Sequence, residues 1–413
     1  MKVLWFTNNA VSLNPNILSG GWMQCLEKYL SVSDDIQLFI ATRAKTASAG
    51  RSVVGKTIYY SIPDHRGITR KRLDIFLDRE PHEYYLQRYL AIIDDVKPDI
   101  IQVFGTEMDY GLICENTEVP VVIHIQGILH SCLYQLLRFK FSIVQLFRAQ
   151  SLFELIRGST YRNGMRVFKR RTVNEARILK SCGNVIGRTE WDKRIITILA
   201  PKARYFHCEE ILRQDFFERV WQLHSHGVLN IASVISAPAY KGHDNIISTC
   251  LVLKMAGVKF KWHVMGLNKT AAIYKLFYKK HESALSGLIK FHGELAPAAM
   301  IDVLLNSTVY VHPSHVENSS NALCEAMALG MPVIAIDAGG NASMIKDGAD
   351  GMIVPDNDPY SLAGMIMLVS ENRELAIELG SNAKRRAHDR HDPEKIVTGL
   401  KAIYTELMRQ HAS

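Results

Sequence analysis

The segment whose residue types and spacing suggest chemistry most clearly runs from Val309 to Gly340 and reads VYVHPSHVENSSNALCEAMALGMPVIAIDAGG. It places Glu317 and Glu325 eight residues apart, and a polar stretch between them leads into a predicted helix near Ala322. Backbone amides at a helix N-terminus, with the positive end of the helix dipole, bind phosphate. A carboxylate just inside the helix suits the vicinal hydroxyls of a ribose instead. The pattern fits a nucleotide diphosphate carrying a sugar, and an ordinary strand–loop–helix unit with solvent-facing glutamates fits the spacing equally well.

Around this segment, short apolar runs alternate with longer helical stretches along the whole chain. This alternation is typical of an α/β fold with mostly parallel strands. Predicted strands of the first half cover Lys2–Thr7, Asp35–Thr42, Lys56–Ile62, Pro98–Phe104 and Val119–Ile125. Those of the second half cover Leu229–Val234, Lys259–Met265, Ile289–Phe291, Val309–His312 and Val333–Ile336. We expect two α/β domains, residues 1–217 and 218–392, followed by a helix over residues 393–413.

The composition is that of a globular protein with a large core, since 47% of the 413 residues are hydrophobic and 22% are charged. No apolar run approaches the roughly 20 residues that span a bilayer. The N-terminus turns polar after Phe6, which is too early for a secretion signal. The seven cysteines are scattered and form no C-x-x-C pair, which indicates reduced thiols rather than a disulfide framework or a zinc site. We therefore expect a cytoplasmic protein.

The net charge of +8 is concentrated between Arg138 and Lys180, where eleven basic residues oppose two acidic ones. The part of this stretch over Leu133–Phe153 mixes Leu, Phe and Ile with cations, which favours a helix in the headgroup region of an anionic membrane. Its phenylalanines are possible apolar inserts: Phe139, Phe141, Phe147 and Phe153. The alternative is a helix pair with one core face and one solvated face. No recognition motif for nucleic acid accompanies the charge, so we expect no nucleic-acid partner.

Several motifs resemble those of the family 4 retaining glycosyltransferases, which have the GT-B fold. The Glu-x7-Glu spacing, with Glu-Ala-Met-Ala-x-Gly-x-Pro-Val and a later Gly-Gly pair, resembles their donor-site signature. The other matching segments, in order, are Ser19–Trp22, Asn184–Asp192, Tyr240–Asp244 and Phe291–Glu294. The resemblance implies two Rossmann-like domains facing across a cleft, with the acceptor on the first and the donor on the second. It also implies that the C-terminal helix packs back on the first domain.

The resemblance implies a role for each matching residue. Glu317 lies by the donor sugar, Glu325 binds the ribose hydroxyls, and Lys241 neutralises the diphosphate without a metal ion. Backbone amides that contact sugar hydroxyls and phosphate belong to Asn318, Ser319, Ser320, Asn321 and Ala322. The backbone approaches the diphosphate at Gly20 and Gly21, and the turn that holds the base comprises His292, Gly293 and Glu294.

The sequence departs from the family pattern at two places. No arginine stands in Val234–Ala239, where family members usually have one about six positions before the lysine. Gln126 stands where many members have an acceptor-side histidine, with His124 on the opposite strand face. His130 is the candidate replacement, although a lone loop histidine is more often structural.

The sequence Asp356-Asn357-Asp358 satisfies the D-x-D pattern of metal-dependent transferases. It directly precedes Pro359 and a predicted helix, which favours a helix N-cap. We therefore predict no metal site and no cofactor.

The predicted function is transfer of a hexose, with retention of configuration, from a UDP- or GDP-linked sugar to a carbohydrate acceptor. Glu317, Lys241 and His130 are the candidate catalytic residues. We expect a lipid-linked oligosaccharide acceptor at the cytoplasmic face of the cell membrane, as in surface polysaccharide assembly, with the protein peripheral there. The alternatives are a nucleotide-sugar epimerase or hydrolase of the same fold, and a non-catalytic nucleotide-sugar-binding subunit, which the missing arginine and histidine would suit.

Overall fold

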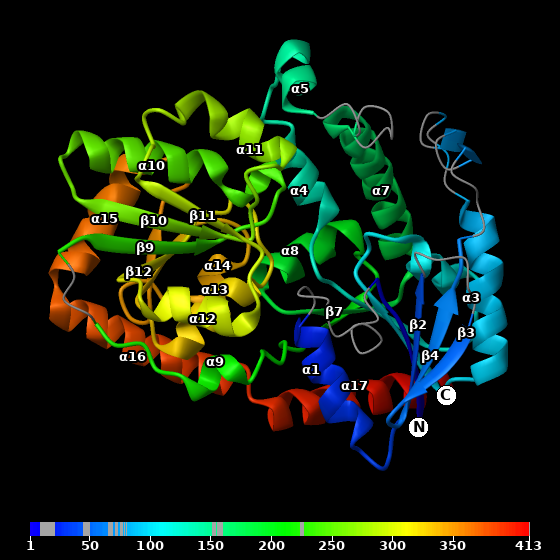
Figure 1. Ribbon diagram of the computed structural model, residues 1–413. Helices are drawn as coiled ribbons and strands as arrows, with labels where there is room; N and C mark the ends of the chain where they lie inside the picture. The colour runs from blue at the N-terminus through cyan, green and yellow to red at the C-terminus, as the bar shows by residue number, and fades with distance from the viewer. Residues whose placement is uncertain are drawn as a thin grey trace. The chain divides into compact units, whose positions relative to one another are not determined.

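The computed structural model describes residues 1–8, 21–43, 50–64, 69–70, 73–74, 77, 79, 81–150, 154, 160–223 and 227–412. The chain divides into two compact units (Figure 1). The first comprises Met1–Leu133, Leu152–Ile211 and Asp392–Ser413, and the second comprises Tyr134–Ser151 and Leu212–His391. We call residues 134–151 the arm, because they belong to the second unit although both neighbouring segments belong to the first.

The first unit is built on an eight-stranded sheet in the order β3-β4-β2-β1-β5-β6-β7-β8. The strands run parallel, except that β3 is antiparallel to β4. Central strands such as β5 (IIQVF) are buried along their whole length, as expected for a parallel sheet covered on both faces. Their bounds are β1 (Lys2–Phe6), β2 (Gln37–Arg43), β3 (Gly50–Val54), β4 (Thr57–Ile62), β5 (Ile100–Phe104), β6 (Val121–His124), β7 (Asn184–Gly187) and β8 (Arg204–His207).

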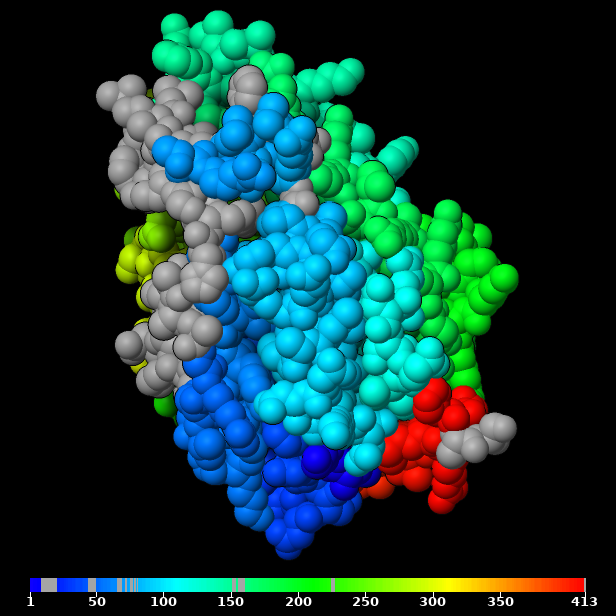
Figure 2. All heavy atoms as spheres, turned by 90° about the vertical axis from the view of Figure 1, so that its right-hand side faces the viewer, coloured from blue at the N-terminus to red at the C-terminus, as the bar shows by residue number. Residues whose placement is uncertain are grey.

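The helices of the first unit include the last one of the chain. Their bounds are α1 (Gly21–Ser31), α3 (His82–Val96), η2 (Asp109–Glu115), α4 (Leu129–Leu136, of which residues 134–136 already belong to the arm), α7 (Tyr161–Ser181), α8 (Glu190–Leu199) and α17 (Pro393–Ala412). Helix α17 places Leu400 and Tyr404 in the core around Trp5. The Trp5 indole N–H donates to the Tyr404 hydroxyl at 3.1 Å, and that hydroxyl donates to Gln102. Strand β1 and the end of α17 lie side by side (Figures 1 and 2).

The second unit is built on a six-stranded parallel sheet in the order β11-β10-β9-β12-β13-β14. Its strands are β9 (Leu229–Val234), β10 (Phe260–Met265), β11 (Ile289–Gly293), β12 (Val309–His312), β13 (Val333–Ile336) and β14 (Met352–Val354). Its helices are α5 (Ile143–Ala149), α9 (Asp215–Glu218), η3 (Ala239–Lys241), α10 (His243–Met255), α11 (Ala272–Phe277), η4 (Lys279–His281), α12 (Pro297–Leu305), α13 (Asn321–Leu329), α14 (Asn341–Met344), α15 (Pro359–Glu371) and α16 (Arg373–Arg390).

Parallel strands bring their carboxyl ends to one edge of a sheet, where open α/β sheets bind ligands. Lys241 follows β9, Glu317 follows β12, the Gly339–Gly340 pair follows β13 and Asp356 follows β14. The second unit therefore gathers the candidate donor residues at one edge of its sheet.

The arm packs on the second unit through aromatic side chains. The rings of Phe139 and Phe141 lie 5.3 and 5.4 Å from the ring of Phe277, which ends α11. Helix α5 of the arm lies next to α11 (Figure 1). The sequence placed this segment with residues 1–217, because chain continuity does not show where aromatic side chains dock. Phe139 and Phe141 are also engaged in this packing, so they are not the apolar inserts that the sequence allowed.

Helices able to cross a membrane are absent from the part of the chain that the structure describes.

Candidate functional site

The loop between β12 and α13, residues 313–320, is fixed from two sides by glycines. Gly242 has a φ of 79°, and a Cβ there would lie 1.9 Å from the Pro313 carbonyl oxygen. Gly339 has a φ of 59°, and a Cβ there would lie 1.9 Å from the Glu317 carbonyl oxygen, which accepts from the Gly340 amide at 2.9 Å. Only glycine combines the left-handed conformation with such a close backbone approach. The Lys-Gly element and the Gly-Gly pair therefore both contact this loop.

Glu317 forms an ion pair with Lys241 in this loop region. Nε2 of His312 lies 3.6 Å from the same carboxylate, and the Ser314 hydroxyl donates to it at 3.4 Å. Burial alone would raise the pKa of Glu317, but Lys241 and His312 lower this pKa to about 2. The carboxylate is therefore ionised at neutral pH, beside a cation that a diphosphate could share.

Glu325 lies inside α13 and is held by an arginine that the sequence did not single out. Nε and Nη2 of Arg213 each donate to one Glu325 carboxylate oxygen at 2.8 Å. Burial raises the pKa of Glu325, and Arg213 opposes this rise. Each carboxylate oxygen keeps a second lone pair for a hydroxyl. The two residues are 112 positions apart, so no sequence motif announces the pair.

Helix α13 begins at Asn321, with Ser320 as its N-cap, whose side chain accepts from the Leu323 amide at 3.4 Å. The free amides of a helix's first turn point out of this end. The Ser319 hydroxyl contacts Met344 of α14 at 3.6 Å, and the Asn318 side chain is buried. The stretch Asn318–Ala322 thus leads into the first turn of a helix whose end faces the edge of the sheet.

The expected base-binding turn ends strand β11. Nε2 of His292 lies 3.0 Å from Nδ1 of His263 on β10, and the two rings stack at 5.3 Å. Burial lowers the pKa of His292, and the neighbouring lysines Lys290 and Lys261 lower it further. The His292 ring is thus directed toward β10, and Gly293, with a φ of 69°, turns the chain toward Glu294.

In the first unit, His130 is the second residue of α4 and contacts a buried carboxylate. Nδ1 of His130 lies 2.5 Å from Glu175 of α7. Glu175 also accepts from the amides of Leu129 and His130 at 2.9 Å and from the Thr106 hydroxyl at 2.6 Å. Glu175 therefore accepts hydrogen bonds from free backbone amides at the N-terminus of α4. It also orients the His130 ring, which is 38% exposed.

Glu107 is a second group of the first unit that the sequence did not single out. Burial, together with the nearby Glu175, raises the pKa of Glu107 to about 7.

Of the two glycines expected to approach the diphosphate, Gly21 begins α1, whereas Gly20 lies outside the described residues.

The two aspartates of the D-x-D pattern have separate roles. Asp358 accepts from the Ser361 amide at 2.9 Å and is the N-cap of α15, with Pro359 in the first turn. This confirms the N-cap predicted from the Asp-Pro pair. Asp356 instead contacts Nδ1 of His315 at 2.7 Å.

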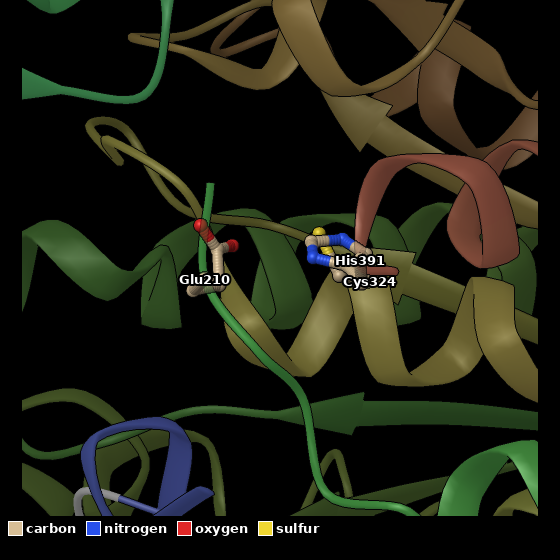
Figure 3. A group of neighbouring side chains, drawn as sticks. All are labelled: Glu210, Cys324 and His391. Atoms are coloured by element: carbon tan, nitrogen blue, oxygen red, sulfur yellow. The ribbon is translucent and has the colours of Figure 1, made fainter. Parts of the chain in front are cut away.

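Cys324 on α13 and His391, directly after α16, place a sulfur and a ring nitrogen within 4.8 Å of each other (Figure 3). Glu210, the third side chain drawn there, belongs to the first unit. Zinc sites use three or four protein ligands. Two donor atoms in one unit therefore carry no metal assignment.

Residues 221–386 match the family model described as glycosyl transferases group 1. The second unit belongs to this family. The chain is 31% identical over 144 residues to D-inositol 3-phosphate glycosyltransferase of Streptomyces bingchenggensis, covering 35% of this chain and 31% of that one. It is 28% identical over 145 residues to the putative colanic acid biosynthesis glycosyltransferase WcaL of Salmonella typhimurium, covering 33% and 35%. The chain thus spans about a third of the length of these two curated relatives.

The fold of the whole chain is similar to that of solved structures. Sucrose-phosphate synthase of Thermosynechococcus elongatus superimposes with a TM-score of 0.72 at 13% identity, over 99% of both chains. HepE of Anabaena, solved with UDP and glucose, superimposes with a TM-score of 0.66 at 14% identity, over 98% of this chain and 100% of that one. These likenesses and the family match confirm the GT-B fold and the resemblance to family 4 that the sequence motifs carry.

Proposed function

We propose that the protein is a retaining hexosyltransferase that transfers sugar from a nucleotide-sugar donor to a carbohydrate acceptor. The observation that carries this proposal is the Lys241–Glu317 ion pair, held beside the N-terminus of α13 in the unit that matches the family. HepE, which shares the fold, was solved with UDP and glucose, and this favours UDP over GDP as the donor nucleotide here.

The chemistry follows from where charge develops during transfer. When the bond between the sugar and the diphosphate breaks, negative charge grows on the leaving diphosphate. Lys241 and the N-terminus of α13 stabilise that charge without a metal ion, because both are fixed before the reaction begins. The ionised Glu317 carboxylate accepts hydrogen bonds from hydroxyls of the donor sugar, and Glu325 accepts them from the ribose. The turn His292–Glu294 contacts the base.

On the acceptor side, we propose that His130 contacts the incoming hydroxyl. Glu175 orients its ring as a buried carboxylate orients the histidine of a nucleophile–base–carboxylate triad. The relative named for colanic acid biosynthesis supports a carbohydrate acceptor, and we propose that this acceptor is a lipid-linked oligosaccharide.

We further propose that the protein associates with the inner face of the cell membrane through the arm. On α5, Ile143 is 83% exposed and Phe147 is 65% exposed, and the cations Lys140 and Arg148 flank them in the sequence. Exposed apolar side chains beside cations are the composition of helices that bind anionic lipid surfaces. A capping box between Ser142 and Gln145 fixes the start of this helix without any lipid.

The test of the proposed reaction is incubation with UDP- and GDP-linked hexoses, with and without a lipid-linked oligosaccharide. Nucleotide released only with the acceptor, and a product that keeps the donor's anomeric configuration by NMR, support the transferase. Release without acceptor would show a hydrolase, and conversion of the sugar would show an epimerase. Binding without turnover would show a non-catalytic subunit.

A further inference from the structure

His315 lies two residues before Glu317, and its side chain is fully buried in the second unit. Nδ1 lies 2.7 Å from Asp356, and Nε2 lies 2.8 Å from Asp244. Ionised carboxylates can only accept hydrogen bonds, so both ring nitrogens must donate. Only the protonated imidazole has two N–H donors, and the geometry therefore requires a positive charge on His315.

Three segments of the unit meet at this ring. Asp244 belongs to the first turn of α10, Asp356 follows β14, and the His315 amide donates to the Tyr240 carbonyl at 2.8 Å. Tyr240 directly precedes Lys241, and His315 is in the same loop as Glu317. His315 therefore links the loop that carries Glu317 to the backbone next to Lys241 through its amide, and to Asp244 and Asp356 through its ring.

Further side chains donate hydrogen bonds to Asp356, and an aromatic ring packs near the imidazole. Asp356 also accepts from the Asn245 side chain at 3.2 Å and, through its other oxygen, from Arg138 of the arm at 3.2 Å. The ring of Phe139, also of the arm, lies 5.7 Å from the His315 ring. The charged groups that face the histidine from these elements are thus two carboxylates, one of which is shared with an arginine.

We propose that His315 is a positioning residue for donor binding, because its two charge-assisted hydrogen bonds hold the loop that carries Glu317 against the backbone that carries Lys241. This inference rests on the proposed donor site and adds to it a residue that does not touch the donor. We call His315, Asp244 and Asp356 the clamp. The arm contributes to it because Arg138 donates to Asp356.

The clamp predicts a pH dependence. Burial would lower the pKa of His315, but Asp244 and Asp356 raise it to about 9 from an ordinary value of 6.5. The stabilising charge is therefore fully present below about pH 6.5 and is lost as the pH rises through about 9. Within the neutral range the loop stays clamped.

The first measurement needs no substrate. Long-range ¹H–¹⁵N NMR of the full chain, with His315→Gln to assign the signal, reports the protonation of both ring nitrogens. We expect both to carry a proton at about pH 7.5 and to titrate near pH 9. A neutral ring at about pH 7.5 would overturn the proposal.

The second measurement is calorimetric titration of UDP at about pH 7 and about pH 10, on either side of this titration. At the lower pH, His315→Gln should weaken UDP binding roughly tenfold or more, the effect of one lost charge-assisted hydrogen bond. At the higher pH, the wild type and His315→Gln should bind UDP with similar affinity. Titration of the nucleotide's own base cancels in the ratio of the two affinities, because both proteins bind the same nucleotide.

Two further variants complete the design. His281→Gln replaces a partly exposed histidine of the same unit and should bind UDP as the wild type does. Asp356→Asn keeps the shape of the site and should move the loss of affinity to lower pH, which tests the clamp even if His315→Gln does not fold. Equal UDP affinity of the wild type, His315→Gln and Asp356→Asn at both pH values would overturn the proposal. A wild type that binds no nucleotide would instead contradict the proposed function.

Discussion

Arg213 and Glu325 form a buried ion pair in which each partner compensates the charge of the other. Removing one partner of such a pair leaves an uncompensated buried charge and costs about 3–5 kcal/mol. Arg213 is 20% exposed, so the lower end of that range applies. The pair therefore has a structural role beside the proposed contact between Glu325 and ribose, and an experiment must separate the two.

We expect Glu325→Ala to lower the free energy of unfolding by about 3 kcal/mol and to weaken UDP binding roughly tenfold or more. The double variant Arg213→Met/Glu325→Met should recover most of the stability, because no charge is left unpaired, but it should not recover UDP binding. Urea unfolding and calorimetry measure the two effects. Wild-type UDP affinity in the double variant would contradict the ribose contact.

Glu317 should act on the sugar rather than on the nucleotide. Glu317→Gln keeps the size of the side chain and removes its charge, so we expect turnover to fall roughly a hundredfold or more. Affinity for UDP should change by less than about threefold, since UDP carries no hexose for Glu317 to contact. Steady-state kinetics and UDP titration give both values. An equal loss of turnover and UDP affinity would place Glu317 at the nucleotide instead.

At the scale of elements, the position of the β12–α13 loop depends on the close approach of Gly242. Gly257, at the other end of α10, is a matched control, because its φ of 71° is close to the 79° of Gly242 but a Cβ there would meet no atom within 4 Å. Both substitutions by alanine carry the cost of a left-handed residue, about 1–2 kcal/mol. Only Gly242→Ala also displaces the backbone at Pro313.

We therefore expect Gly242→Ala to lower the melting temperature more than Gly257→Ala does, and to weaken UDP binding where Gly257→Ala does not. Thermal unfolding and UDP titration of the two variants test this. Equal behaviour of the two variants would show that the loop does not depend on this contact.

Apolar runs between turn residues were enough to predict several elements of the second unit. The runs at Val309–His312 and Val333–Ile336 predicted β12 and β13 with their observed bounds. Strand β14 was missed because it is three residues long, and β3 was missed because all of its residues are exposed. Strand β14 is apolar throughout but too short to show a period, and β3 lacks the apolar pattern from which a buried strand is recognised.

The candidate site was predictable where its chemistry is local in sequence. Glu317 and Glu325 share one segment, and the Asp358-Pro359 pair announces its own helix cap. The partners of His315 lie 71 residues before it and 41 residues after it, and the partner of His130 lies 45 residues away. Such pairs form only when the sheet brings distant loops together, so the sequence proposed His130 without its partner and did not single out His315.

At the scale of the whole molecule, membrane association should depend on α5 of the arm. Ile143→Ser together with Phe147→Ser should abolish co-sedimentation with vesicles that contain anionic lipid, and high salt should release the wild type. The control is Ile198→Ser on α8, where an isoleucine is similarly exposed, at 78%. Wild-type sedimentation of the α5 variant would show that the surface of the arm does not contact lipid.

Calorimetric titration of UDP, with EDTA present, into the wild type and Lys241→Met tests whether Lys241 binds the diphosphate without a metal ion. The control is Lys259→Met, which changes an exposed lysine directly before β10. We predict that the wild type and Lys259→Met bind UDP with EDTA present, and that Lys241→Met binds roughly ten- to a hundredfold more weakly. Equal affinity of all three proteins, or binding that requires Mg²⁺ or Mn²⁺, would contradict a metal-independent diphosphate site at Lys241.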